Sequence, residues 1–255
     1  MEKIAFFGIE VEPLTFGQAV HKMKQLLHEG GGKMIATPNT EIAMAARKNI
    51  PLRHLINDAD MVVPDGIGLV IGAKLRHLHL PERVTGYDLS MELLRIAEKE
   101  GYRLFLLGGR PSVAKKAMEN LKEDFPALQV VGAQHGYFKG SHNGCPGHEE
   151  ERAVLRDIRD SGADIVFVGL GFPKQEQFIH RFGKETGARL LIGNGGVIDV
   201  LAGEAKRAPE VFIKLHLEWF YRLLKNPSRW KRQLAIPQFL YYVIMDEKAV
   251  TRVIK

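Results

Sequence analysis

The sequence of 255 residues contains one cysteine, Cys145, and only two tryptophans. A single cysteine excludes an intrachain disulfide and a cysteine metal cluster, and it favours a reducing compartment. No stretch approaches about 18 uncharged apolar residues, so we expect no membrane-spanning helix. Internal repeats and low-complexity segments are also missing. With 45% apolar and 26% charged residues, the chain has the balance of a globular protein that buries its own core.

Charge is spread unevenly along the chain. The net charge is +6, and residues 204–255 carry all of it, with 11 Lys and Arg against 5 Asp and Glu. The preceding residues hold 25 charges of each sign. The same tail contains both tryptophans and 8 of the 21 aromatic residues. A neutral body with a basic, aromatic tail indicates a separate element that meets something anionic.

Short apolar runs alternate with segments of helical spacing through residues 1–203. Runs that end in Gly, Pro or Asn are typical of buried parallel strands; they cover 34–36, 61–63, 104–107, 129–132, 164–168 and 189–192. Helices are predicted between them, including 15–27 with a capping box, 67–75, and one that Asp88 caps. This alternation predicts a Rossmann-like α/β fold, with a mostly parallel sheet and helices on both faces.

The pattern changes after Gly203. Residues 209–224 are helical and apolar on one side, and two further helical pieces follow at 227–234 and 238–245. We therefore expect a catalytic α/β domain in residues 1–203 and a helical appendage in 204–255. Basic, Trp-bearing amphipathic segments bind anionic bilayers. Nucleic acid is another possible anion, although the body lacks a basic field to support it; a packed helix pair with solvated cations is the third interpretation.

Polar side chains follow two of the predicted strands. Thr37 and Asn39 come directly after residues 34–36, and Asp65 follows residues 61–63. Ligands of open α/β sheets bind beyond the carboxyl ends of the strands, so these side chains should face one crevice. The alternative is that Asn39 and Asp65 only cap the helices that follow.

Glycine-rich turns follow three other strands, at residues 108–109, 169–171 and 193–196. Such turns let backbone amides approach a phosphate at a helix N-terminus, although none forms a full dinucleotide motif. Lys174 and Gln175 lie in the first turn of the helix that follows the glycine-rich turn at residues 169–171. Lysine opposes the helix dipole there and suggests an anion such as a pyrophosphate, whereas Glu176 suits an ordinary exposed first turn. Gln175 is a candidate for binding a sugar hydroxyl or uracil.

Two other patterns resemble metal-binding motifs in residue type and spacing alone. Residues 58–60 match a DxD motif, but they precede a strand and should lie at the wrong end of the sheet. His142, Cys145 and His148 share one loop, where an accidental origin is the better interpretation. We therefore expect no metal and no cofactor.

Taken together, the motifs resemble those of the WecG/TagA/CpsF glycosyltransferase family, almost end to end. The resemblance is carried by Thr37-Pro38-Asn39, Val63-Pro64-Asp65-Gly66, residues 83–88, Leu107-Gly108-Gly109, residues 169–176, Gly195-Gly196 with Asp199, residues 203–209, and Leu217-Glu218-Trp219 with Arg222.

The resemblance implies an inverting enzyme that transfers a sugar from a UDP donor to lipid-diphosphate-linked GlcNAc without a metal. In the TagA-like branch the donor is UDP-N-acetylmannosamine (UDP-ManNAc), the acceptor is undecaprenyl-diphosphate-GlcNAc, and the product is the linkage unit of wall teichoic acid. The resemblance makes Asp65 the catalytic base, with Thr37, Asn39 and Gln175 lining its pocket. The expected substrate-binding residues are Arg83, Gly108, Gly109, Gly171, Lys174, Glu176, Asn194, Gly195, Gly196, Asp199 and Arg207.

For the tail, the resemblance implies a place on the membrane. Arg222, Arg229 and Arg232 are expected near the lipid diphosphate, and Trp219 and Trp230 at the membrane surface. The predicted location is cytoplasmic, on the inner face of the cell membrane, with no nucleic-acid partner. ManNAc uronic acid or glucose as the donated sugar, a non-catalytic UDP-sugar-binding protein, and a homo-oligomer all stay open.

Overall fold

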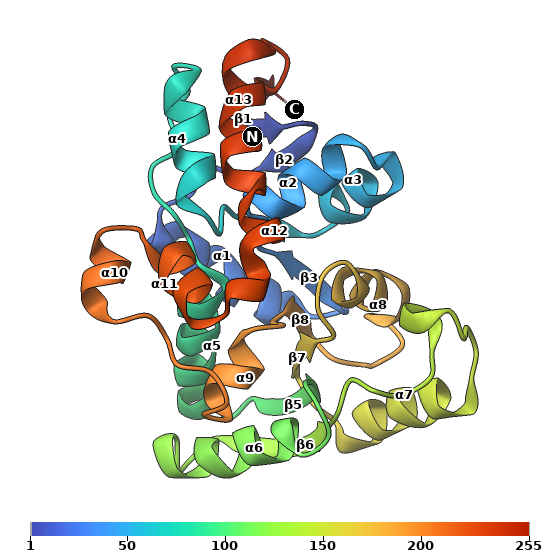
Figure 1. Cartoon of the computed structure of the whole chain (residues 1–255). Helices are drawn as coiled ribbons and strands as arrows, with labels where there is room; N and C mark the ends of the chain where they lie inside the picture. The colour runs from blue at the N-terminus through green and yellow to red at the C-terminus, as the bar shows by residue number, and fades with distance from the viewer. Residues whose placement is uncertain (1, 255) are drawn as a thin grey trace.

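A computed structural model describes residues 2–254, with the side chains of Arg229 and Lys231 excluded. The predicted role of the Arg229 side chain therefore lies outside the described residues. The centre of the molecule is a sheet of six parallel strands (Figure 1), which confirms the α/β prediction. Its strands lie in the order β4 (Met61–Val62), β3 (Lys33–Ala36), β8 (Leu190–Gly193), β7 (Ile165–Gly169), β5 (Arg103–Gly108) and β6 (Gln129–Gln134).

Helices cover both faces of this sheet (Figure 1). One hydrophobic cluster includes side chains of α2 (Thr40–Arg47), α3 (Ile50–Asn57), α4 (Ile67–Leu75), α7 (Glu149–Ser161), α8 (Lys174–Phe182) and α13 (Ala235–Met245). The other includes side chains of α1 (Phe16–Glu29), α5 (Gly86–Glu100), α6 (Val113–Asp124) and α9 (Val197–Leu201). The short helix η1 (Ser141–Asn143) lies in the loop between β6 and α7.

The strands explain why two separate cores form. Side chains alternate between the faces of a strand, and in β5 Leu104 and Leu106 join one cluster while Phe105 and Leu107 join the other. All four are buried. A strand buried on both sides has a continuous apolar sequence, which is why these runs were recognisable without alternation.

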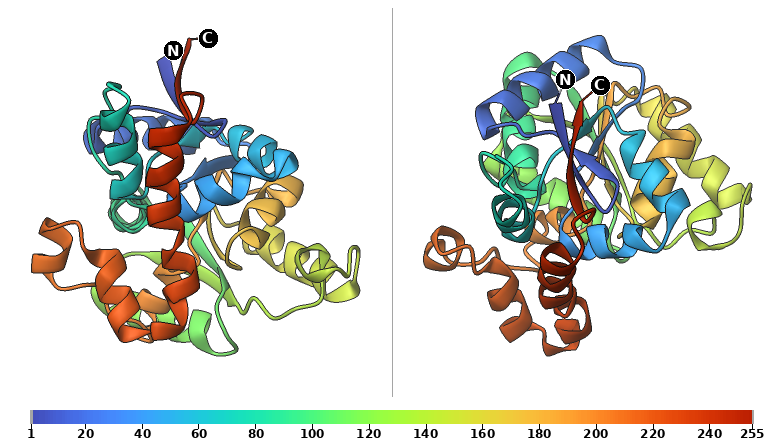
Figure 2. Two further views of the ribbon diagram at one scale, coloured as in Figure 1. Left: turned by 45° about the horizontal axis from the view of Figure 1, so that its top comes forward. Right: turned by 90° about the horizontal axis from the view of Figure 1, so that it is seen from above.

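A second, smaller sheet joins the two ends of the chain. β1 (Glu2–Phe6) pairs antiparallel with β2 (Ile9–Val11) and, on its other side, with β9 (Val250–Ile254). The chain ends consequently lie side by side (Figure 2). α13 packs beside this sheet, where Phe239 is fully buried and its ring contacts those of Phe6 and Phe7.

The segment between α9 and α13 contains four short helices that project from the body (Figures 1 and 2). They are α10 (Glu210–Lys214), α11 (Glu218–Lys225), η2 (Pro227–Arg229) and α12 (Trp230–Gln233). The prediction of one helix over 209–224 was wrong, because the chain turns at His216 with φ of 58° and divides it into α10 and α11. We refer to residues 204–234 as the projecting segment.

Within the predicted appendage, the projecting segment and the last residues differ. α13 has Phe239 and Val243 in the body's core, and β9 belongs to a sheet with β1. A strand was not expected after Gly203. The division of the chain into two domains at residue 204 therefore stays a prediction, and the part that stands apart in the structure is the projecting segment.

Helix starts follow local capping chemistry. Thr15 and Gln18 form the predicted capping box of α1. Asp88 was the wrong choice of cap for α5, because the Thr85 hydroxyl accepts the Asp88 amide and the helix begins at Gly86. No helix of the described residues combines the length and the apolar character that crossing a membrane requires.

Candidate active site

The predicted site residues gather at one rim of the large sheet. The parallel strands end together at Ala36, Val62, Gly108, Gly169 and Gly193. Each turn that carries a candidate residue starts from one of these ends. The structure therefore brings the rim residues to one side of the molecule, as parallel pairing requires.

The turns after β3 and β4 are bonded to each other. The Asp65 amide donates to the Pro38 carbonyl at 2.9 Å, which places Asp65 beside the Thr37–Asn39 turn. Asn39 does cap a helix, since its side-chain oxygen accepts the Ile42 amide at 3.1 Å. Asp65 does not cap α4, because the N-cap residue of that helix is Gly66 and no side chain makes a cap hydrogen bond. Of the two residues, Asp65 keeps its carboxylate available for another task.

The pKa of Asp65 is shifted far from that of an ordinary aspartate. Burial raises its pKa to about 7, while the Arg222 and Arg83 guanidinium groups and the Gly86 amide lower it, and Glu218 raises it slightly. A carboxyl group with a pKa near neutrality accepts a proton more readily than an ordinary aspartate, and about half of such groups are ionised near pH 7. Asp65 is therefore suited to act as a general base.

A cavity of about 600 Å³ lies beside these turns at the same rim. It is lined by Gly109, Arg110, Gly136, Tyr137, His142, Asn143, Gly169, Leu170, Gly171, Lys174, Gly195, Asp199, Glu204 and Ala205. Five of these were predicted from the sequence: Gly109, Gly171, Lys174, Gly195 and Asp199. Thr37, Asn39 and Asp65 lie outside the lining, so the predicted site consists of a cavity and a separate polar turn.

Both signs of charge face the cavity. Lys174 and Arg110 contribute cations, and Glu204 pairs with Arg110 at 3.4 Å and with Lys116 at 2.9 Å. Burial raises the pKa of Asp199, and Arg110 partly offsets this. Cations beside backbone amides suit a diphosphate, whereas an acid at the cavity wall suits a donor such as a ribose hydroxyl or a base N–H.

Sequence reasoning did not assign the other nine lining residues to the site. Arg110 immediately follows the glycine pair at 108–109, so its position after the strand was a usable signal. Tyr137 and His142 come from the loop after β6. No motif marked Tyr137, and His142 was considered only as part of a formal metal pattern. His142 is buried against the Phe138 ring, with centroids 4.4 Å apart, and burial lowers its pKa.

Two glycines of the predicted turns are needed for space. Gly108 has φ of 145°, and a side chain there would collide with the Gly169 carbonyl of the neighbouring strand. A Cβ on Gly193 would lie 2.6 Å from the Gln175 amide nitrogen. These glycines therefore allow strand ends and the start of α8 to approach closely.

A buried polar chain lies between the cavity and the Asp65 turn. Gln175 donates to Glu176 at 2.9 Å, and burial raises the pKa of Glu176. Asn194 accepts from Ser90 at 2.9 Å, and Ser90 also donates to the Gly86 carbonyl. Gln175, Glu176 and Asn194 each keep one buried polar atom without a protein partner. Such atoms are suited to a polar ligand, because leaving them unpaired is costly.

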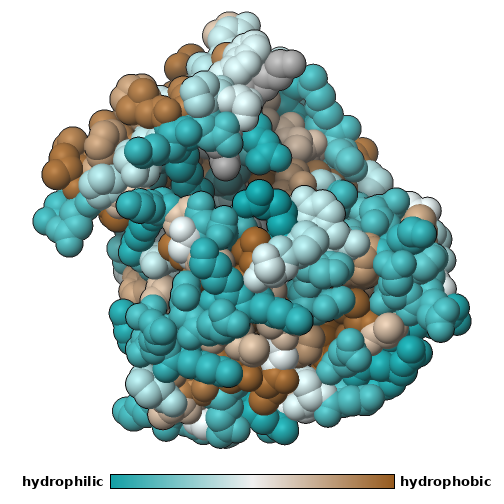
Figure 3. Space-filling view, turned by 60° about the horizontal axis from the view of Figure 1, so that its bottom comes forward, coloured by the Kyte–Doolittle hydropathy of each residue, from teal (hydrophilic) through white to brown (hydrophobic). Residues whose placement is uncertain are grey.

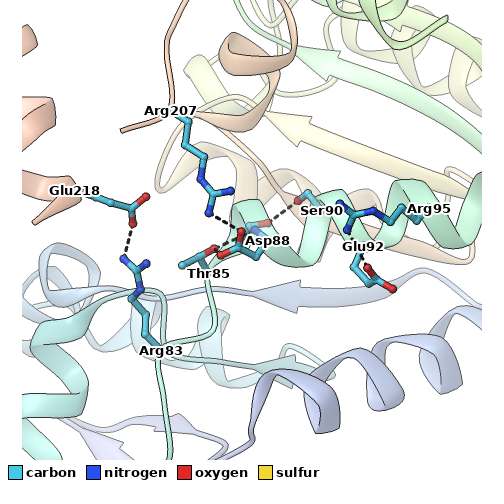
Figure 4. A network of polar contacts seen from close by, with 9 residues as sticks. Arg83, Thr85, Asp88, Ser90, Glu92, Arg95, Arg207 and Glu218 are labelled. Atoms are coloured by element: carbon cyan, nitrogen blue, oxygen red, sulfur yellow. Dashed lines mark hydrogen bonds and ion pairs between the residues drawn. The ribbon is translucent and has the colours of Figure 1, made fainter. Parts of the chain in front are cut away.

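Arg207 binds the protein itself. Its guanidinium donates to Asp88 at 2.6 Å and lies over the Tyr87 ring, 4.3 Å from the centroid (Figure 4). Asp88 also accepts from the Thr85 hydroxyl at 2.7 Å. Arg83 points in turn to Glu218 of α11 (Figure 4). Two predicted substrate-binding arginines thus connect the body to the projecting segment.

The arginines of the projecting segment interact with different residues of the body. Arg222 acts on Asp65, whereas Arg232 lies 3.4 Å from Glu41 at the start of α2. Trp219 is half-buried, and Trp230 is 53% exposed. The space-filling view shows apolar residues gathered at its upper-left corner (Figure 3). Exposed apolar side chains of the projecting segment include Val211 on α10 and Leu215 directly after it.

The two formal metal motifs have structural partners. Asp60 accepts the Met34 amide at 2.9 Å at the amino end of β3, and Asp58 contacts His180. His148 caps α7. Among the described residues, no group of three or more His, Cys, Asp and Glu side chains is arranged to hold a metal ion.

Comparison with known proteins agrees with this geometry. The sequence model of the glycosyl transferase WecG/TagA/CpsF family matches residues 4–252. The chain is 39% identical over 229 residues to the N-acetylglucosaminyldiphosphoundecaprenol N-acetyl-beta-D-mannosaminyltransferase of Bacillus spizizenii, covering 90% of this chain and 85% of the relative. It is 37% identical over 225 residues to the protein of that name in Bacillus subtilis, covering 88% and 84%. The chain belongs to the WecG/TagA/CpsF family of glycosyltransferases.

Proposed function

We propose that this protein transfers N-acetylmannosamine from UDP-ManNAc to undecaprenyl-diphosphate-linked GlcNAc, with inversion. The observation that carries the proposal is Asp65, a carboxylate of raised pKa beside a cavity suited to a nucleoside diphosphate. The relatives' names supply the transferred sugar and the acceptor. A non-catalytic UDP-sugar-binding protein has no use for such a base.

In this mechanism, Asp65 takes the proton from the GlcNAc hydroxyl as that oxygen attacks the anomeric carbon of the donor. The bond from that carbon to the diphosphate oxygen breaks on the opposite face, and UDP leaves with the electron pair. One base is sufficient for such a single displacement. Thr37 and Asn39, on the neighbouring turn, are assigned to orient the acceptor.

The departing UDP needs compensation of charge. Lys174 and Arg110 at the cavity, with the backbone amide of Gly171, are the groups that we assign to it. Gln175 and Asn194, whose buried polar atoms lack a protein partner, are assigned to the donated sugar or the uridine. Asp199 is assigned to a hydrogen-bond donor of the nucleotide.

The projecting segment is proposed to meet the inner face of the cell membrane. It combines the exposed apolar residues of α10 with the basic residues of α11 and α12. A lipid-linked acceptor requires such a contact, because its diphosphate lies at the bilayer surface. Arg222 and Arg232 are proposed to face that diphosphate.

The test is UDP release from UDP-ManNAc, with and without a short-chain lipid-diphosphate-GlcNAc. Acceptor-dependent release is expected. Asp65→Asn should lower kcat/KM by about 10³-fold, a typical contribution of a general base, and should keep UDP affinity because Asp65 lies outside the cavity lining. Asp160→Asn is the matched control, since that carboxylate is 74% exposed on α7.

The outcomes separate the alternatives. Release with UDP-ManNAc uronic acid or UDP-glucose in place of UDP-ManNAc would change the donor and keep the mechanism. UDP binding without release from any donor, in the presence of vesicles, would favour a non-catalytic binding protein.

A further inference from the structure

The contact between Arg83 and Glu218 joins the projecting segment to the body at the active site. Arg83 lies in the loop before α5, and Glu218 is the first residue of α11. Their side chains form an ion pair with only 12% and 14% exposed. An ion pair that is shielded from water holds its geometry, because separating the charges leaves each without compensation.

The same helix carries Arg222 one turn further on. Residues four apart on a helix share a face, so Glu218 and Arg222 both point to the body. Arg222 is the strongest of the groups that lower the pKa of Asp65, ahead of Arg83 and the Gly86 amide. The charged groups that act on Asp65 are thus Arg83 from the loop and Glu218 and Arg222 from α11.

Little else fixes the rotation of α11. No described side chain of this helix is fully buried. The ring contacts of Trp219 and Tyr221 are with Phe220 and Phe212, which belong to the same segment. A helix without a buried apolar stripe can slide or turn, so the ion pair at its first residue is the contact that sets its register.

From this arrangement we infer that Glu218 is a positioning residue: by holding Arg83, it orients α11 so that the Arg222 guanidinium faces Asp65. The residue acts through Arg222 and touches neither the donor nor the acceptor. The inference depends on the proposed function only in taking Asp65 as the base.

Glu218→Gln tests the inference, because two roles predict opposite shifts of the pH profile. If Glu218 were only a nearby negative charge, removing it would lower the pKa of Asp65 and move the acidic limb of kcat/KM to lower pH. If Glu218 positions Arg222, its loss releases that cation, and the limb moves to higher pH. We expect an upward shift of about one pH unit, the usual effect of losing a close opposite charge.

The matched control is Glu210→Gln, which removes the same charge from the same segment. Glu210 is 84% exposed on α10 and pairs only with Lys214 among its described contacts. Its pH profile should equal that of the unmodified protein. Glu218→Asp keeps the charge and should recover part of the shift. An unchanged or downward-shifted limb in Glu218→Gln overturns the inference, as does a lower KM alone, which would mean that Glu218 occupies a substrate anion's place on Arg83.

Hydrogen exchange of residues 218–225 gives a second readout that needs no substrate. Glu218→Gln should accelerate exchange in α11, and Glu210→Gln should leave it unchanged. Equal exchange in both variants would refute the positioning role of Glu218, even if the protein used a sugar donor other than UDP-ManNAc. A lack of turnover in the unmodified protein would instead count against the proposed function and leave this result valid.

Discussion

The sheet-based body and the projecting segment are held in place by different forces. In the body, strands such as β5 and β7 bury every apolar side chain between two layers of helices. In α10 and α11, no described residue is fully buried, and the exposed side chains include Val211, Leu215 and Leu224. Hydrophobic burial therefore stabilises the body, whereas contacts of another kind attach the projecting segment to it.

Ion pairs provide the attachment. Glu204 pairs with Arg110 and Lys116, Arg207 with Asp88, Glu218 with Arg83, and Arg232 with Glu41. The partners on the body surround the proposed site. Charged contacts near a surface are weaker than a packed core and depend on ionic strength. The difference indicates that the projecting segment is held to the body by contacts that are weaker than those of a packed core.

The largest expected difference between the regions is in stability. Phe167→Ala removes a fully buried ring from β7 and should lower the free energy of unfolding by about 4 kcal/mol. Leu215→Ala, at a side chain that is 62% exposed directly after α10, should change it by less than about 0.5 kcal/mol. Urea unfolding measures both. Similar costs for the two changes would show that α10 packs more firmly than its exposure indicates.

For membrane binding, we expect residues of the projecting segment to matter more than residues of the body. Leu215→Ala should weaken binding to anionic vesicles by about tenfold, because one inserted leucine contributes roughly 1.5 kcal/mol. Ile50→Ala is the control, since Ile50 is equally exposed but lies on α3 of the body. Vesicle co-sedimentation compares them. If both variants bound as the unmodified protein does, the membrane contact would have to lie elsewhere.

The smallest effect concerns the charge that the segment places at the site. Arg222 lowers the pKa of Asp65, so Arg222→Ala should raise that pKa above about 7. A base must be ionised, so activity at neutral pH falls severalfold and recovers at higher pH. A profile of kcat/KM against pH records the shift. Lys225→Ala, on the same helix, should leave the limb in place. Loss at every pH would instead indicate that Arg222 also binds substrate.

The sequence was most informative where the structure is most buried. Continuous apolar runs identified the six parallel strands, and the turns after them located Thr37, Asp65 and the cavity glycines. All of these signals are local, since a strand end and its turn are adjacent in the chain. The expectation that Asn39 and Asp65 face one rim followed from parallel pairing alone.

Tertiary contacts decided what could not be predicted. The pairing of β9 with β1 joins opposite ends of the chain, and a short exposed strand gives little sequence signal. Tyr137 and His142 reach the cavity because a loop folds back, which no spacing rule describes. The salt bridge of Glu218 with Arg83 spans 135 positions, so neither residue marks the other.

The projecting segment leaves the body after α9 and returns to it at α13, which is fixed through Phe239 and followed by β9 in the sheet of β1. It is thus a loop anchored at both ends, and release of its ion pairs cannot carry it far. An intramolecular partner of this kind has an effective concentration in the millimolar range or above. If the projecting segment repeatedly detached and returned, a lipid-borne acceptor would be able to enter and leave the site from the side. The segment would stay close enough to bind the body again.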